Sequence, residues 1–188
     1  MSSDNTASYV TVGKGKVGGY MYRAPAGTTP PNDASTALAT AYKCLGYISE
    51  EGVKNSNEIE SATIKDWNGD TVLQTKTGRV DKWTVTLIEA MNPEVLKAVW
   101  GDSNISGALA TGLTINANNT DNGSSVYVFE MIYNGNVLHR VVLPNAYVAE
   151  LGEITYAAGD AVGFNIGLIA AADTNGNTHY EYIKQPGT

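Results

Sequence analysis

The sequence predicts a mainly β protein, an antiparallel β-sandwich or half-barrel with one flanking α-helix. Short runs in which apolar and polar residues alternate recur along the chain, and a period of two is typical of strands with one buried face. Asn-Gly and similar turn signals separate these runs, and 20 Gly among 188 residues favour turns over long helices. A single segment carries both helix-start and helix-stop signals.

The N-terminal part is expected to contribute little to the core. Residues 1–16 are polar and contain one short strand-like piece, which indicates an N-terminal arm, and one domain is expected over residues 17–188. Three prolines and a glycine predict a loop at residues 24–33. Both ends, residues 2–16 and 179–188, are short and polar, so we expect neighbouring molecules to order them.

A hairpin is predicted in the middle of the first half. Residues 56–67 alternate and place Glu58, Glu60 and Asp66 on one face. The Asn68-Gly69 pair is a strong turn signal, and the polar segment 68–80 that contains it is expected to form a long hairpin or loop.

The strand over residues 82–89 has the clearest alternation in the chain. Its apolar side chains point one way and its polar side chains the other, so one face is expected to be buried and the other wet. The wet face carries Lys82, Thr84 and Thr86.

One helix is predicted over residues 92–100. Asn92 is a good N-cap, Pro93 suits the first helical position, and Gly101 stands where a helix-ending glycine belongs. The helix is too short to be stable alone, so we expect it to pack on the sheet through Leu96, Val99 and Trp100. Beyond it, the chain is nearly all strand and turn.

Charge and cysteine content exclude several classes of protein. The chain carries 12 basic and 19 acidic residues, a net charge of −7, and no basic stripe of the kind that holds nucleic acid by counterion release. One Cys cannot form an intramolecular disulfide. The polar start does not resemble a signal peptide, and no apolar run is long enough to span a membrane, so synthesis in a cytoplasm is expected.

The motifs that suggest chemistry are incomplete. The glycine spacing at residues 13–18 matches a dinucleotide-binding pattern, but strand-like residues follow where that pattern needs a helix. Residues 173–184 resemble a calcium loop that ends in lysine rather than glutamate. We therefore expect no enzyme, no cofactor and no metal site.

Two classes of function fit a β protein with few charges and polar arms. One is a self-assembling structural protein, and the other is an extracellular binding module such as a carbohydrate-binding or adhesin domain. A carbohydrate-binding module requires exposed aromatic side chains gathered on one face. The candidates for such a face are Tyr20, Tyr22, Tyr42 and Tyr47.

Several stretches, taken in order, resemble a known family. They are residues 45–52 and 64–67, the helical segment 92–102, and the stretch 163–182. Their order and spacing are similar to those of the tail tube proteins, or major tail proteins, of long-tailed bacteriophages. The similarity extends over about residues 42–183.

The resemblance implies a tail-tube fold and a structural role in the virion. In that family six copies form a ring, the inner sheets of neighbours join into one barrel around a lumen, and stacked rings form a tube that conducts DNA. The expected location is the phage tail, after synthesis in the host cytoplasm. The implied partners are further copies of the chain and the tape-measure, terminator and baseplate or tip proteins, without a membrane. The family has no catalytic residues to transfer.

This reading suggests two sets of assembly residues. An acidic lumen would repel phosphate, so DNA could pass without specific binding. The candidate lumen-facing residues are Glu58, Glu60, Asp66, Lys82, Thr84 and Thr86. The segment 68–80 is expected to reach an adjacent ring, and its candidate inter-ring residues are Asn68, Asp70, Gln74, Lys76 and Arg79.

Overall fold

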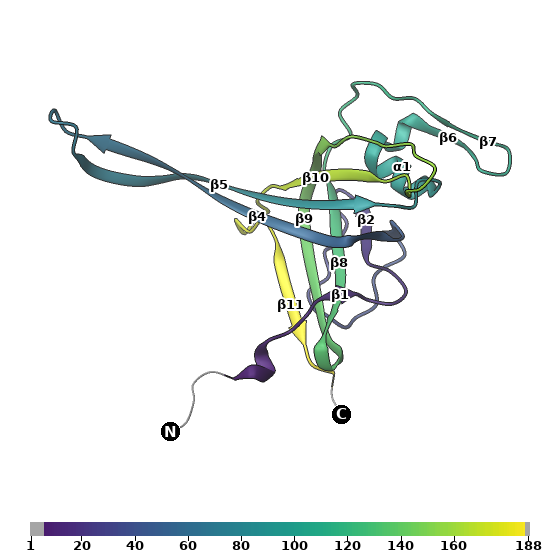
Figure 1. Ribbon diagram of the computed structural model, residues 1–188, viewed down its shortest axis with the longest axis horizontal. Helices are drawn as coiled ribbons and strands as arrows, with labels where there is room; N and C mark the ends of the chain where they lie inside the picture. The colour runs from purple at the N-terminus through teal and green to yellow at the C-terminus, as the bar shows by residue number, and fades with distance from the viewer. Residues whose placement is uncertain (1–5, 187–188) are drawn as a thin grey trace.

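A computed structural model describes residues 6–186, and in this part of the chain it confirms the predicted mainly β, antiparallel fold with one α-helix (Figure 1). The larger sheet follows the order β3-β2-β8-β9-β10-β5-β4, with β1 also paired to β8 and β11 to β9, and β6 pairs with β7 in a small second sheet. The strands are β1 (Lys14–Gly15), β2 (Met21–Pro25), β3 (Lys43–Cys44), β4 (Ile48–Lys65), β5 (Thr71–Leu87), β6 (Ile105–Ala108), β7 (Gly112–Ile115), β8 (Ser125–Tyr133), β9 (Val137–Leu151), β10 (Phe164–Ala170) and β11 (Tyr180–Lys184). The α-helix is α1 (Pro93–Trp100), and 3-10 turns cover Ala7–Tyr9, Asp102–Asn104 and Asn134–Asn136.

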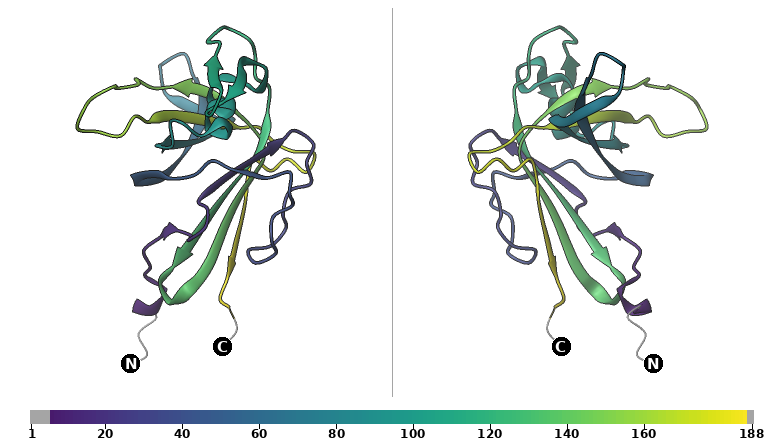
Figure 2. Two further views of the ribbon diagram at one scale, coloured as in Figure 1. Left: turned by 90° about the vertical axis from the view of Figure 1, so that its right-hand side faces the viewer. Right: turned by 90° about the vertical axis from the view of Figure 1, so that its left-hand side faces the viewer.

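Strand β9 connects the two parts of the large sheet. Its first half pairs with β8 on one side and β11 on the other, and its second half pairs with β10. Figure 2 shows β8, β9 and β11 running side by side away from the layer that holds β10 and β5. The sheet therefore curls into a half-barrel, and within residues 6–186 β4 remains an edge strand without a second partner.

Each face of the β8–β9 region covers a separate core. The larger core lies between this region, β5, β10 and α1, and it includes Trp83, Leu96, Phe129 and Ile166. The smaller core lies on the opposite face, beneath the segment 26–42, which we call the strap. It contains Ala24, Tyr42, Val126, Val128 and Val142. The strap contains most of the predicted proline-rich loop, and it covers this second core.

The predicted helix forms where the local signals place it. The Asn92 side chain accepts a hydrogen bond from the Glu94 backbone N–H at 3.0 Å, and Gly101 ends the helix with a φ of 95°, a value that favours glycine. Leu96 and Val99 are buried against the sheet, as expected, and Trp100 packs at the edge of the same core.

Leu96→Ala should destabilise the protein by about 2–4 kcal/mol, because it removes a fully buried side chain that holds α1 on the sheet. Urea denaturation of the purified chain measures this change. A loss below about 0.5 kcal/mol would show that the helix is not docked on the core, since such a value is typical of exposed positions.

The expectation that both chain ends depend on neighbouring molecules is wrong where the ends pair with the chain's own sheet. Lys14 and Gly15 pair with β8, and Tyr180–Lys184 pairs with β9 along its whole length. Lys14, Gly15 and the C-terminal strand thus belong to the chain's own sheet, whereas residues 6–13 contain a 3-10 turn and no strand. Residues 1–5 and 187–188 lie outside the described part, so the prediction is not tested there.

Candidate assembly surface

The β4–β5 hairpin is the most prominent projection of the molecule. It pairs Val53 with Val85 at its base and Lys65 with Thr71 at its tip, so the predicted segment 68–80 is only the turn and one arm of a longer hairpin. Its base packs on the larger core, while residues 54–77 are exposed along both arms. Figure 1 shows the outer half extending away from the body.

Asp66 lies in the turn rather than on the strand face predicted for it. Its carboxylate accepts hydrogen bonds from the backbone N–H groups of Asn68 at 3.0 Å and Asp70 at 2.8 Å. Gly69 has a φ of 91°, which only glycine adopts readily. Asp66 therefore closes the turn, and its assignment to a lumen-facing strand with Glu58 and Glu60 is not supported by its position.

The other candidate lumen residues share one face. Glu58 pairs with Val80, Glu60 with Gly78 and Ser56 with Lys82, all in one register, so Glu58, Glu60 and Lys82 are on the same face. This face is opposite the buried side chains of Trp83, Val85 and Leu87. The polar face that results contains Lys54, Glu58, Glu60, Lys82, Thr84 and Thr86.

Contacts from neighbouring strands extend the polar face. Lys82 Nζ lies 2.7 Å from both carboxylate oxygens of Glu150 on β9, and the side-chain amide of Asn165 on β10 donates to Thr86 Oγ1 at 2.9 Å. The partner of Lys82 is therefore an acid two strands away rather than one of the candidate acids on β4. Gly167 lies between these strands, and a side chain there would meet Glu150 and Lys82 at 3.2–3.3 Å.

The candidate inter-ring residues divide between the turn and the opposite face. Asn68 and Asp70 lie in the turn. Gln74, Lys76 and Arg79 pair with Thr63, Ser61 and Ile59, respectively, away from the polar face. Two of them bond across the hairpin, with Gln74 Nε2 donating to Ser61 Oγ at 3.3 Å and Arg79 Nε to Asn57 Oδ1 at 2.9 Å.

Two bulges interrupt the outer half of the hairpin. Because of them, alternation in the sequence does not predict which residues share a face there. Glu60 pairs with Gly78 and Ser61 with Lys76, which leaves Thr77 as an extra residue, and Val72 is extra in the same way near the tip. Each bulge shifts the alternation of β5 relative to β4 and increases the local twist. Gly78 adjoins the first bulge, and a glycine within a strand can mark one, whereas Val72 carries no such signal.

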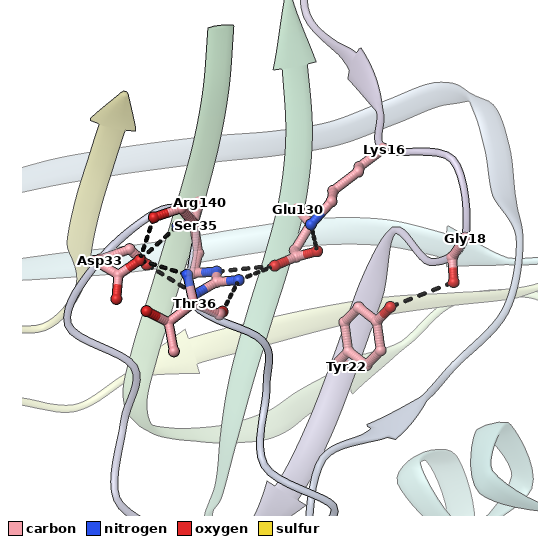
Figure 3. Close-up of polar contacts among 8 residues, drawn as sticks. All are labelled: Lys16, Gly18, Tyr22, Asp33, Ser35, Thr36, Glu130 and Arg140. Carbon is pink, nitrogen blue, oxygen red and sulfur yellow. Dashed lines mark hydrogen bonds and ion pairs between the residues drawn. The ribbon is translucent and has the colours of Figure 1, made fainter. Parts of the chain in front are cut away.

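A buried ion cluster, which sequence reasoning missed, fixes the strap to the sheet (Figure 3). Arg140 on β9 is 1% exposed. It donates from Nε to Glu130 Oε1 at 2.9 Å and to the backbone carbonyls of Asp33 and Thr36 at 2.8 and 2.9 Å. Lys16 contacts the second oxygen of Glu130 at 2.6 Å. The arm, the strap and the sheet are thus held by one charge network.

A second buried acid, Asp81, lies at the base of the hairpin. Its carboxylate accepts hydrogen bonds from Asn55 Nδ2 at 2.7 Å, from Thr178 Oγ1 at 2.6 Å and from His179 Nδ1. Burial alone would raise the pKa of Asp81, but these hydrogen bonds and the nearby His179 outweigh it and hold the pKa below its ordinary value. Asp81 therefore connects β4 and β5 to the segment just before β11.

Asp81→Asn should remove a pH-dependent part of the stability. A carboxyl with a lowered folded-state pKa stabilises the fold above its unfolded pKa, here 3.8, and that contribution is lost as the pH falls through the folded-state value. The unfolding free energies of wild type and variant should differ most near neutral pH and converge below about pH 4. Equal differences at pH 7 and pH 3 would contradict the role of this carboxylate.

The four candidate tyrosines do not form an exposed aromatic platform. Tyr42 is buried in the smaller core and donates its hydroxyl to the Thr29 carbonyl at 3.0 Å. Tyr22 packs against the same core, whereas Tyr20 and Tyr47 meet edge to face elsewhere. The arrangement gives no support to a carbohydrate-binding face.

Within residues 6–186, no helix has the length and apolar character needed to cross a membrane, and no group of three His, Cys, Asp or Glu side chains is placed to bind a metal ion. What this part of the chain does present is a long hairpin with a free edge and a polar face on a curled sheet.

These features define a β-rich structural subunit. A family model for the phage tail tube protein matches residues 3–186, and the chain therefore belongs to the phage tail tube protein family. No match was found among curated proteins. Membership confirms the resemblance, and with it a structural role, self-association and a place in the virion tail.

Proposed function

We propose that the chain assembles into hexameric rings that stack into the tail tube and conduct DNA into the host. The observation that carries the proposal is the β4–β5 hairpin, which projects from the body with 18 residues of β4 on a free edge. A free edge recruits further strands, because its N–H and C=O groups lack partners. A closed ring satisfies such edges, since each subunit pairs with the next.

The polar face is proposed to line the lumen. It carries Glu58, Glu60 and Glu150 against Lys54 and Lys82, so its acids outnumber its lysines, and each lysine is already paired with a glutamate, Glu51 or Glu150. Phosphate groups would find few cations there, and DNA could slide past without being held. Asn68, Asp70, Gln74, Lys76 and Arg79 are proposed to lie at or near the contact between rings, and the tape-measure, terminator and baseplate or tip proteins to be the partners at the tube ends.

Electron microscopy of the purified chain tests the proposal. We expect rings and tubes with a central channel and six-fold symmetry. A protein that stays monomeric at high concentration, at several salt concentrations and in the presence of tail tips would contradict the tube function.

The double variant Glu58→Lys/Glu60→Lys tests the lumen assignment. Tubes of this variant should retain DNA at low salt and release it as salt rises, because the added contacts to phosphate are screened. The measurement is DNA retained by sedimented tubes over a salt series. Asp121→Lys/Asp160→Lys, the same charge change on exposed loops, is the matched control and should retain none. Equal retention by both variants would place Glu58 and Glu60 outside the lumen.

A further inference from the structure

The tip of the hairpin is apolar, although the segment around it is polar. Trp67 is fully exposed in the turn, and Ile64, Val72 and Leu73 are 55%, 63% and 48% exposed. Ile64 and Leu73 are directly paired across the hairpin. We call these four residues the apolar tip. Exposed apolar side chains gathered at one point are typical of an interaction site.

A groove of about 740 Å³ with an apolar lining lies at the other end of the molecule. Its walls come from the segment after β5, the start of α1, the β6–β7 turn and the loop before β10, and they include Ile88, Met91, Pro93, Leu109 and Val162. Met91 and Leu109 are 71% and 59% exposed. We call it the helix groove.

The Glu89 carboxylate at the edge of the helix groove already has hydrogen-bond partners within the chain. The carboxylate of Glu89 accepts from the Tyr47 backbone N–H and from Asn92 Nδ2, both at 2.9 Å. Glu89 therefore keeps its hydrogen bonds when an apolar side chain covers the groove. Burying a carboxylate without such partners would be costly.

Strand β5 separates the apolar tip from the helix groove. It begins at Thr71, beside the tip, and ends at Leu87, one residue before the groove. Its 17 residues span about 55 Å at 3.3 Å per residue. The tip of one chain cannot reach its own groove, and Figure 1 shows the hairpin and the α1, β6 and β7 elements on opposite sides of the body.

We propose that the apolar tip of one copy inserts into the helix groove of a second copy. Two different surfaces at opposite ends of one molecule make a head-to-tail contact, which builds an open stack when the rotation between copies does not close a ring. This inference rests on the proposed tube function and specifies its contact between rings. It assigns the contact to Ile64, Trp67, Val72 and Leu73, whereas the polar residues of the hairpin lie around it. The spacing along the stack cannot exceed about 60 Å, the length of β5 with its turn.

Single serine variants test the donor and acceptor surfaces separately. Trp67→Ser and Leu109→Ser should each raise the protein concentration needed for tubes about tenfold or more, since a central aromatic or aliphatic anchor dominates such contacts. Ile59→Ser is the matched control, because Ile59 is 66% exposed on the same hairpin, away from the tip, and should change this concentration little. Normal tubes from both Trp67→Ser and Leu109→Ser would overturn the inference.

Disulfide trapping tests the contact directly. In a Cys44→Ser background, Leu73→Cys with Leu109→Cys should give a ladder of covalent oligomers after oxidation of tubes, whereas each single variant should give none. Suppose that the wild type forms tubes, the double cysteine variant gives no ladder, and Trp67→Ser assembles normally. This outcome would refute the contact but not the tube function. Failure of the wild type to form rings or tubes would refute both.

Discussion

A chain whose hairpin is shortened, with residues 63–74 replaced by Asn-Gly, is expected to fold normally and to lose the ability to form tubes. The removed residues are exposed and make no contact with either core. Ala62 and Thr75 are paired, so a two-residue type I′ turn can join them without a change in register. The subunit keeps its fold because its stability comes from burial elsewhere.

Two measurements separate folding from assembly in this variant. Thermal unfolding should match that of the wild type, and electron microscopy should show monomers or single rings in place of tubes. Deleting Val72–Gly78 alone is a poorer test, because it removes the outer part of one arm and leaves residues 60–64 of β4 without their partners. Tubes of normal length from the shortened chain would contradict a stacking role for the hairpin.

The elements that the sequence predicts well are those specified by neighbouring residues. The α1 helix has its cap, its first-turn proline and its terminal glycine within ten positions, so no distant contact is needed to place it. The strand ending at Leu87 alternates because one of its faces is buried.

The length of the hairpin was underestimated for the opposite reason. Beyond its base no core packs against the hairpin, so burial imposes no apolar alternation on residues 71–80, and this polar part of β5 resembles a loop. Asp66 was misplaced because a local turn, rather than the strand period, decides its position.

The buried polar residues could not be found from local pattern. Arg140 meets the carbonyl of Asp33, 107 positions earlier, and Asp81 meets His179, 98 positions later. Each lies within a strand. The alternation of that strand predicts which face the side chain is on, but not which distant residue it contacts. The pairing of β9 with β8 brings Arg140 to Glu130, whereas Asp81 reaches His179 only because β5, β10, β9 and β11 all belong to one sheet.

Arg140→Met should therefore cost about 3–5 kcal/mol of unfolding free energy, among the largest effects of any single substitution, because it leaves a buried carboxylate short of its main partner. Glu130 would keep only Lys16, and the carbonyls of Asp33 and Thr36 would lose their donor. Urea denaturation gives the size of the loss. Hydrogen exchange at Ser35 and Thr36, which both donate to the Asp33 side chain, should show faster opening of the strap.

Two control variants separate the charge from the packing. Lys16→Met removes the half-exposed partner of Glu130 and should cost less than about 1 kcal/mol, because partly solvated ion pairs contribute little. Glu130→Gln combined with Arg140→Met removes the uncompensated charge and should be more stable than Arg140→Met alone. If the double variant is no more stable than the single one, Arg140 acts mainly by holding the strap carbonyls. The charge pair with Glu130 would then be secondary to the attachment of the strap over the smaller core.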